Sequence, residues 1–186
     1  MSINLKKGGS INLTKQMPKL NKVMVGLGWE MSSFTVDLDA SVFMLGANNR
    51  LLSDEYFVFY NNLKSPDGSV QHLGDNRSGS TEDDDEVILA NLVNINPAAQ
   101  DLVICVSIHD ANVRRHNFGL LRDAYIRIVD VDNQKEVARY DLDASHATEN
   151  AVVFGRLRKT GSDWHFQAAS QGTSQELQGL LDMFVA

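Results

Sequence analysis

The sequence predicts an all-β protein: a single-domain β-sandwich of two mainly antiparallel sheets with a short C-terminal helix. Short runs that alternate apolar and polar residues recur along the chain, turn residues separate them, and only the last segment has helical periodicity. Many short strands followed by one terminal helix favour a sandwich over a sheet built from alternating strands and helices. The chain has 186 residues, so we expect one domain spanning 1–186.

The strands follow from the alternation of side chains. Residues 23–29 and 34–38 place apolar side chains at every second position, as a half-buried strand does. The wholly apolar run at 56–60 is typical of a central strand. Asp132-Asn133 and the segment 160–163 have the composition of hairpin loops. Further strands are predicted at 87–92, 102–108, 124–131, 136–142, 151–158 and 164–168.

One helix is predicted, at the C-terminus. Leu177, Leu180, Leu181 and Phe184 fall on one face of a helix that Ser174 could cap.

Charge and composition exclude several classes of function. The net charge is −7 and the isoelectric point about 5.1, so the surface repels nucleic acid, anionic lipid and oxyanions alike. No apolar run approaches the roughly 20 residues of a membrane-spanning helix, and the N-terminal residues do not resemble a secretory signal. Cys105 is the only cysteine, which excludes an intrachain disulfide. We therefore expect a cytoplasmic protein that neither binds nucleic acid nor inserts into a membrane.

Two aspartates in the second predicted strand form the first candidate site. Asp37 and Asp39 are two residues apart, so their side chains project to the same side of the strand. At about 6 Å and an effective dielectric of about 20, two carboxylates repel by roughly 3 kcal/mol. A divalent cation would turn this repulsion into binding energy. The alternative is an exposed pair whose repulsion is screened by water.

An acidic loop forms the second candidate. The segment Gly-Asp-Asn-Arg-Ser-Gly at 74–79 is followed by an unbroken acidic run at 82–86. Its carboxylate, amide and hydroxyl oxygens suit Ca²⁺, whereas Zn²⁺ would require Cys or His ligands. The loop is not an EF-hand, because Arg77 occupies a position that needs an oxygen donor. The alternative is a solvated acidic loop.

Several segments together resemble the TerD family of bacterial tellurium-resistance proteins. The two most specific are Val-Asp-Leu-Asp-Ala-Ser at 36–41 and the Gly-Asp-Asn and Asp-Asp-Glu parts of the acidic loop, in that order. The resemblance extends along nearly the whole chain. It includes Ile-Asn-Leu-Lys-Lys-Gly-Gly at 3–9, His-Asp-Ala at 109–111, Asn-Phe-Gly at 117–119, Ala-Tyr-Ile-Arg at 124–127 and Ala-Arg-Tyr-Asp-Leu at 138–142.

The resemblance implies a non-enzymatic β-sandwich that binds Ca²⁺, and we expect more than one ion. It also implies a role in tellurite resistance and general stress response alongside related tellurium-resistance proteins. We further expect the protein to be a calcium-dependent scaffold for such partners. Thr81, Glu82 and Asp83 depart from the family's glycine-rich pattern, so the loop path and one ligand can differ. Carried over by position, the metal-site residues are Asp37, Asp39, Asp75, Asn76, Gly79, Asp84, Asp85 and Glu86, with Gly79 supplying backbone geometry.

Two other interpretations use the same residues. One is a Mg²⁺- or Mn²⁺-dependent hydrolase or transferase, for which His72 and His109 are the candidate general bases. The other treats the acidic loop as the solvated surface of a plain interaction domain. The sequence does not specify an oligomeric state.

Overall fold

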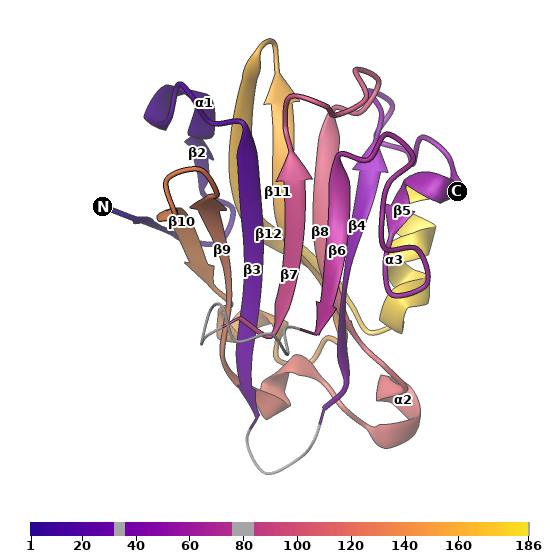
Figure 1. The fold of residues 1–186 in the computed structure, drawn as a ribbon. Coiled ribbons are helices and arrows are strands. Elements are labelled where there is room, and N and C mark those ends of the chain that lie inside the picture. The colour runs from indigo at the N-terminus through magenta and orange to yellow at the C-terminus, as the bar shows by residue number, and fades with distance from the viewer. Residues whose placement is uncertain (32–35, 76–83, 186) are drawn as a thin grey trace.

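The computed structural model describes residues 1–31, 36–75 and 84–185. Within these residues the chain forms two six-stranded sheets that pack face to face (Figure 1). This arrangement confirms the predicted β-sandwich of two mainly antiparallel sheets.

The first sheet, sheet A, has the strand order β1-β10-β9-β3-β7-β6. Its pairings are antiparallel except that of β1 with β10, which is parallel. The strands are β1 (Ile3–Leu5), β10 (Lys135–Asp141), β9 (Leu121–Asp130), β3 (Lys22–Met31), β7 (Glu86–Asn91) and β6 (Val70–Asp75).

The second sheet, sheet B, has the order β2-β12-β11-β8-β4-β5, and all its pairings are antiparallel. Its strands are β2 (Ser10–Asn12), β12 (Asp163–Thr173), β11 (Ala151–Thr160), β8 (Asp101–Ile108), β4 (Leu38–Leu45) and β5 (Phe57–Val58). The helical elements are α1 (Leu13–Gln16), η1 (Asp54–Tyr56), α2 (Ala111–Arg114), η2 (Phe118–Leu120), η3 (Ala144–His146) and α3 (Glu176–Phe184).

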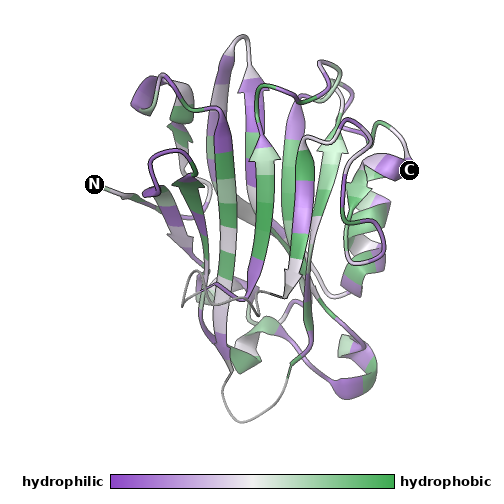
Figure 2. Cartoon of the chain, viewed as in Figure 1, coloured by the Kyte–Doolittle hydropathy of each residue, from purple (hydrophilic) through white to green (hydrophobic). Residues whose placement is uncertain are grey.

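The main core lies between the sheets and follows directly from strand alternation. In β3, Val23, Val25 and Leu27 point inward and are fully buried, so the intervening Met24 and Gly26 lie on the outer face of sheet A. Figure 2 shows hydrophobic residues gathered on the strands and hydrophilic residues on α1 and many of the turns. The outer face of sheet A carries no helix in Figure 1.

A second apolar cluster lies on the other side of sheet B, under α3. Leu180 and Phe184 pack on Phe43 and Val103, and the Phe43 and Phe184 rings are 5.1 Å apart. This packing explains the predicted apolar face of the C-terminal helix. Within the described residues, no helix combines the length and the hydrophobicity needed to cross a membrane.

Three details of the prediction are corrected. The run at 56–60 is not a central strand, because β5 has two residues and lies at the edge of sheet B. The chain turns back there, and Phe59 exchanges backbone hydrogen bonds with Asn62. The strand predicted at 34–38 instead begins at Leu38 among the described residues and runs on to Leu45, whereas 34–35 lie outside them.

The start of α3 also differs. Gln175 rather than Ser174 is the N-cap residue, and its side chain makes no capping bond. The side-chain oxygen of Asn150 instead accepts the hydrogen bond of the Glu176 amide, at 2.8 Å. A residue distant in sequence therefore satisfies a free amide at the helix start.

Candidate functional site

The described parts of both acidic segments lie at one end of the sandwich. Strands β3 and β6 end there and β4 and β7 begin there, at the lower end in Figure 1, and α2 lies at the same end. Asp75 is the last residue of β6 and pairs with Glu86 at the start of β7. Two of the predicted metal-site residues, Asn76 and Gly79, lie outside the described residues.

The aspartate pair belongs to the sheet B side. Asp39 is half-buried in β4, on the face that carries Phe43 and α3, and it lies opposite Ser107 of β8. Asp37 is exposed just before β4, and its main-chain oxygen accepts a hydrogen bond from the His109 amide at 2.8 Å. The strand therefore leaves the Asp37 side chain accessible to solvent and holds Asp39 in a more enclosed position.

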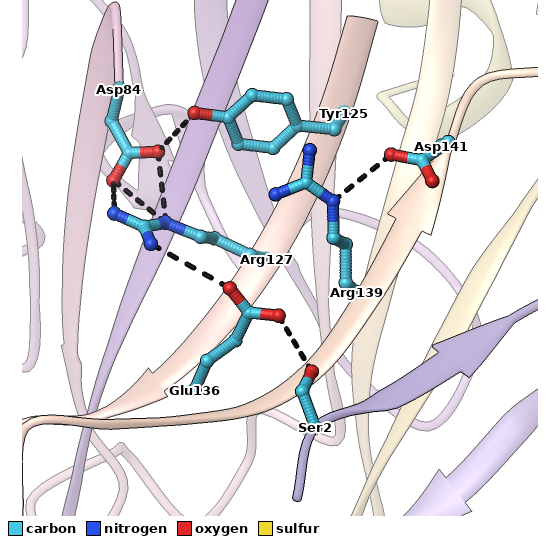
Figure 3. Close-up of polar contacts among 7 residues, drawn as sticks. All are labelled: Ser2, Asp84, Tyr125, Arg127, Glu136, Arg139 and Asp141. Atoms are coloured by element: carbon cyan, nitrogen blue, oxygen red, sulfur yellow. Dashed lines mark hydrogen bonds and ion pairs between the residues drawn. The ribbon is translucent and has the colours of Figure 1, made fainter. Parts of the chain in front are cut away.

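The Asp84 carboxylate lies on the opposite side, on the outer face of sheet A (Figure 3), and its side chain is 0% exposed. Its Oδ1 atom accepts hydrogen bonds from the Tyr125 hydroxyl at 2.8 Å and from Arg127 Nε at 3.0 Å. Its Oδ2 atom accepts from Arg127 Nε at 3.0 Å and Nη2 at 2.7 Å. This is a charge-assisted clamp of the kind that gives the strongest side-chain hydrogen bonds.

Two glycines of β3 make room for this clamp. A Cβ atom at Gly26 would lie 2.4 Å from Asp84 Oδ2, and one at Gly28 would lie 2.5 Å from the Tyr125 ring. Both distances are far shorter than van der Waals contact. The carboxylate and the ring therefore lie directly on the bare backbone of β3, between β7 and β9.

The clamp continues across sheet A to the N-terminal segment, as Figure 3 shows. Arg127 Nη1 lies 3.6 Å from Glu136 Oε2, and the Ser2 hydroxyl donates to Glu136 Oε1 at 2.6 Å. The Arg139 guanidinium stacks on the Tyr125 ring, 3.9 Å from its centroid. Burial, the hydrogen bond to Asp84 and the charge of Asp84 together raise the pKa of the Tyr125 phenol, so this hydroxyl remains a donor.

Asp85 and Glu86 point elsewhere. Asp85 donates its amide to Leu27 O, and its carboxylate accepts the Trp29 amide, both at 2.8 Å. Burial and the neighbouring charge of Asp84 raise the pKa of the Asp85 carboxyl, despite the opposing hydrogen bond from Trp29. Asp85 nevertheless remains exposed to solvent at the end of the sandwich.

Glu86 faces the interior, where its carboxylate lies 3.2 Å from His72 Nε2 and both side chains are buried. His72 Nδ1 accepts the Gly74 amide at 2.8 Å, and Nε2 lies 3.2 Å from Ala40 O in sheet B. The Asp84 carboxylate thus lies on the outer face of sheet A, Asp85 stays exposed to solvent and Glu86 faces the interior of the sandwich. Among the residues that the structure describes, no three His, Cys, Asp or Glu side chains form a group able to hold a metal ion.

The sequence alone did not predict the clamp, although two of its residues lie within one segment that resembles the TerD family. Tyr125 and Arg127 belong to the Ala-Tyr-Ile-Arg segment at 124–127, and the period of two puts both on one face of β9. Gly26 and Gly28 lie directly opposite Arg127 and Tyr125 in the pairing of β3 with β9. The sequence shows that each pair of residues shares one face of its strand, but it does not show that β3 and β9 pair with each other.

The fold and this end of the molecule define a β-sandwich protein with an acidic loop whose C-terminal part is held by an arginine. The chain belongs to the TerD family, since residues 1–184 match the TerD domain. It is 46% identical over 175 residues to tellurium resistance protein TerD of Serratia marcescens, covering 92% of this chain and 91% of that protein. It is 40% identical over 176 residues to general stress protein 16U of Bacillus subtilis (strain 168), covering 92% and 91%.

A solved structure supports the fold. A homologue of telluride resistance protein (TerD) from Streptomyces coelicolor A3(2) superposes with a TM-score of 0.67, at 20% identity, and covers 90% of this chain and 99% of that one.

Proposed function

We propose that the protein is a non-catalytic, calcium-binding module of the bacterial cytoplasm that acts in tellurite resistance and general stress response. In this proposal Ca²⁺ orders a surface that other tellurium-resistance proteins recognise. The observation that carries the proposal is that the described parts of the two acidic segments lie at the same end of the sandwich. The names of the relatives, a tellurium resistance protein and a general stress protein, support the biological role.

The donor chemistry fits Ca²⁺ better than a softer metal. The candidate side chains supply carboxylate and amide oxygens, which Ca²⁺ binds six to eight at a time in flexible geometry. Cys105, the one thiol of the chain, is buried beneath α3 on sheet B and cannot contribute. The described carboxylates do not form a complete site by themselves, so Asn76 remains a proposed ligand and Gly79 a proposed source of backbone geometry.

The physical role proposed for the ion is to cross-link the two acidic segments. Asp37 lies before β4 of sheet B, whereas Asp85 precedes β7 of sheet A. Without a cation, like charges at this end repel one another, in a chain whose net charge is already −7. An ion bound between the segments would neutralise that charge and favour one arrangement of the end, which a partner could then distinguish.

Calorimetric titration of chelator-stripped protein with Ca²⁺ tests the proposal. The wild type should bind Ca²⁺ saturably and prefer it to Mg²⁺. The double variant Asp37→Asn/Asp39→Asn should bind at least about tenfold more weakly, because charged ligands largely set the affinity of such sites. The control is Asp54→Asn/Glu55→Gln, which neutralises two exposed carboxylates of η1 outside the candidate set. Unchanged affinity in the Asp37/Asp39 variant would refute this site.

A metal-dependent hydrolase remains the competing function. The structure does not favour His72 as its base, because the ring is 4% exposed and both its nitrogens have close polar contacts. His109 is about half-exposed, and its Nε2 atom lies 3.5 Å from Asp110 Oδ2, so it is the better candidate base. Turnover of a phosphate-ester panel that Mg²⁺ or Mn²⁺ stimulates and His109→Ala abolishes would establish this alternative instead.

A further inference from the structure

We propose that Asp84 is a positioning residue of the calcium site and not one of its ligands. Arg127 and Tyr125 hold its carboxylate on the outer face of sheet A, and this anchor sets the path of the chain through Asp85 and Glu86. The inference rests on the proposed calcium function and refines its ligand set.

Both carboxylate oxygens of Asp84 already accept hydrogen bonds. Each accepts two hydrogen bonds, at 2.7 to 3.0 Å, and the Arg127 guanidinium supplies three of the four. A cation bound to this carboxylate would displace donors or lie close to the guanidinium charge. Both outcomes disfavour binding, because the arginine is protonated at every relevant pH and the pair is shielded from solvent.

The backbone of β3 leaves room for the anchor. Gly26 and Gly28 leave the outer surface of β3 bare where Asp84 and Tyr125 lie, and a methyl group at either position would collide with them. Arg127 reaches the carboxylate from β9, on the far side of β3 from β7. The carboxylate therefore links the start of β7 across β3 to β9.

The anchor orients Asp85, the residue that follows Asp84. The residue after Asp84 bonds to β3 twice, through the Asp85 amide to Leu27 O and through its carboxylate from the Trp29 amide. With Asp84 on the outer face, Asp85 stays exposed to solvent, where it can meet an ion. Mutation of a residue that orients a metal ligand without binding the metal itself typically weakens metal affinity about 10- to 100-fold.

The test uses variants for which the two roles of Asp84 predict opposite results. Calorimetric titration with Ca²⁺ compares Asp84→Asn, Arg127→Met and the double variant with the wild type. If Asp84 is an anchor, all three bind Ca²⁺ about 10- to 100-fold more weakly by a similar factor, because each breaks the same contact. If Asp84 is a ligand, Arg127→Met frees its carboxylate and strengthens binding, whereas Asp84→Asn weakens it. That result would overturn the proposal.

A matched control excludes a general effect of charge. Arg122→Met removes one positive charge from an exposed residue of the same strand, β9, and should leave Ca²⁺ affinity within about twofold of the wild type. Tyr125→Phe removes only the hydroxyl donor and should weaken binding in the same direction as Arg127→Met but by less. If Asp84→Asn does not fold, this milder variant still shows whether weakening the clamp weakens Ca²⁺ binding.

Hydrogen exchange of the metal-free protein separates failure of the anchor from failure of the calcium proposal. Breaking the anchor should accelerate exchange of the Trp29 and Asp85 amides by at least about tenfold, while the Val106 amide in central β8 keeps its wild-type rate. A wild type that binds no Ca²⁺ would refute the calcium proposal. The exchange rates would still show whether Asp84 anchors the start of β7. Unchanged exchange at Trp29 and Asp85 in Arg127→Met would refute the anchor itself.

Discussion

Gly26→Ala tests whether the Asp84 carboxylate lies on the bare backbone of β3. The new methyl group would lie 2.4, 2.6 and 2.8 Å from the Oδ2, Cγ and Oδ1 atoms of Asp84. These contacts involve the whole carboxylate, which Arg127 and Tyr125 hold in place, so Asp84 cannot move without losing hydrogen bonds. The substitution should therefore destabilise the fold, although alanine normally suits a strand better than glycine does.

The magnitude follows from opposing contributions. Overpacking costs about 1 to 3 kcal/mol, and partial disruption of a buried ion pair adds to this, up to the roughly 3 to 5 kcal/mol of losing one partner. Lower chain entropy of the unfolded state returns about 0.4 to 1 kcal/mol. We expect a net loss of about 3 kcal/mol, which corresponds to a fall in the melting temperature of roughly 6 to 12 °C for a domain of this size.

Urea denaturation followed by circular dichroism measures this loss, with two comparisons. Gly46→Ala is the control, because its Cβ would meet only side-chain atoms at 3.2 Å or more, apart from one backbone oxygen at 3.6 Å. In the Arg127→Met background, Gly26→Ala should cost less, since the carboxylate is then free to move. A Gly26→Ala protein as stable as the wild type would refute the described position of Asp84.

Three further predictions concern other parts of the molecule. Hydrogen bonds from Ser65 and Ser69 outweigh burial and lower the pKa of Asp67, so its stabilising effect is present above the unfolded pKa and is lost as the pH falls through the lower folded value. The stability advantage of the wild type over Asp67→Asn should therefore shrink between about pH 5 and about pH 3 in urea titrations. Phe184→Ala should cost about 3 kcal/mol of unfolding free energy in the same assay, because the ring is buried under α3. Burial raises the pKa of the Cys105 thiol, so a thiol reagent at about pH 8 should label it only as fast as the protein unfolds, and rapid labelling of native protein would contradict its position.

Strand alternation predicted most of the sandwich because a residue's face depends only on local spacing. The ranges at 102–108 and 151–158 match β8 and β11, and the predicted turns at 132–133 and 160–163 connect β9 to β10 and β11 to β12. Alternation says nothing of where a strand lies within a sheet, which is why the apolar run at 56–60 was wrongly placed at the centre. Phe57 is buried against Phe43 of the neighbouring strand β4 and against the apolar cluster under α3, whereas Phe59 is only partly buried beside Phe57.

The short N-terminal strands escaped prediction for a related reason. Strands β1 and β2 have three residues each, too few for a periodic pattern to be recognised. They form through pairing with β10 and β12, more than a hundred residues away in sequence. Contacts of this kind depend on the assembled sheet and not on local preference.

The candidate site was predictable in composition but not in geometry. The sequence predicts one acidic group of Asp84, Asp85 and Glu86, whereas in the structure the first is clamped on the outer face, the second is exposed and the third is buried in the interior. The separation of these carboxylates depends on partners that are distant in sequence: Arg127 binds Asp84, and His72 lies beside Glu86. A run of like charges predicts repulsion, but only the fold shows how each charge is accommodated.

The thermal stability of chelator-stripped protein, titrated with Ca²⁺ and separately with Mg²⁺, tests the proposed calcium function most directly. A ligand that binds only the folded state adds about 2.7 kcal/mol at 100 times its dissociation constant, which raises the melting temperature by roughly 5 to 11 °C for this chain length. We expect a saturable rise with micromolar Ca²⁺ and little change with Mg²⁺. No rise with either ion would contradict the calcium proposal.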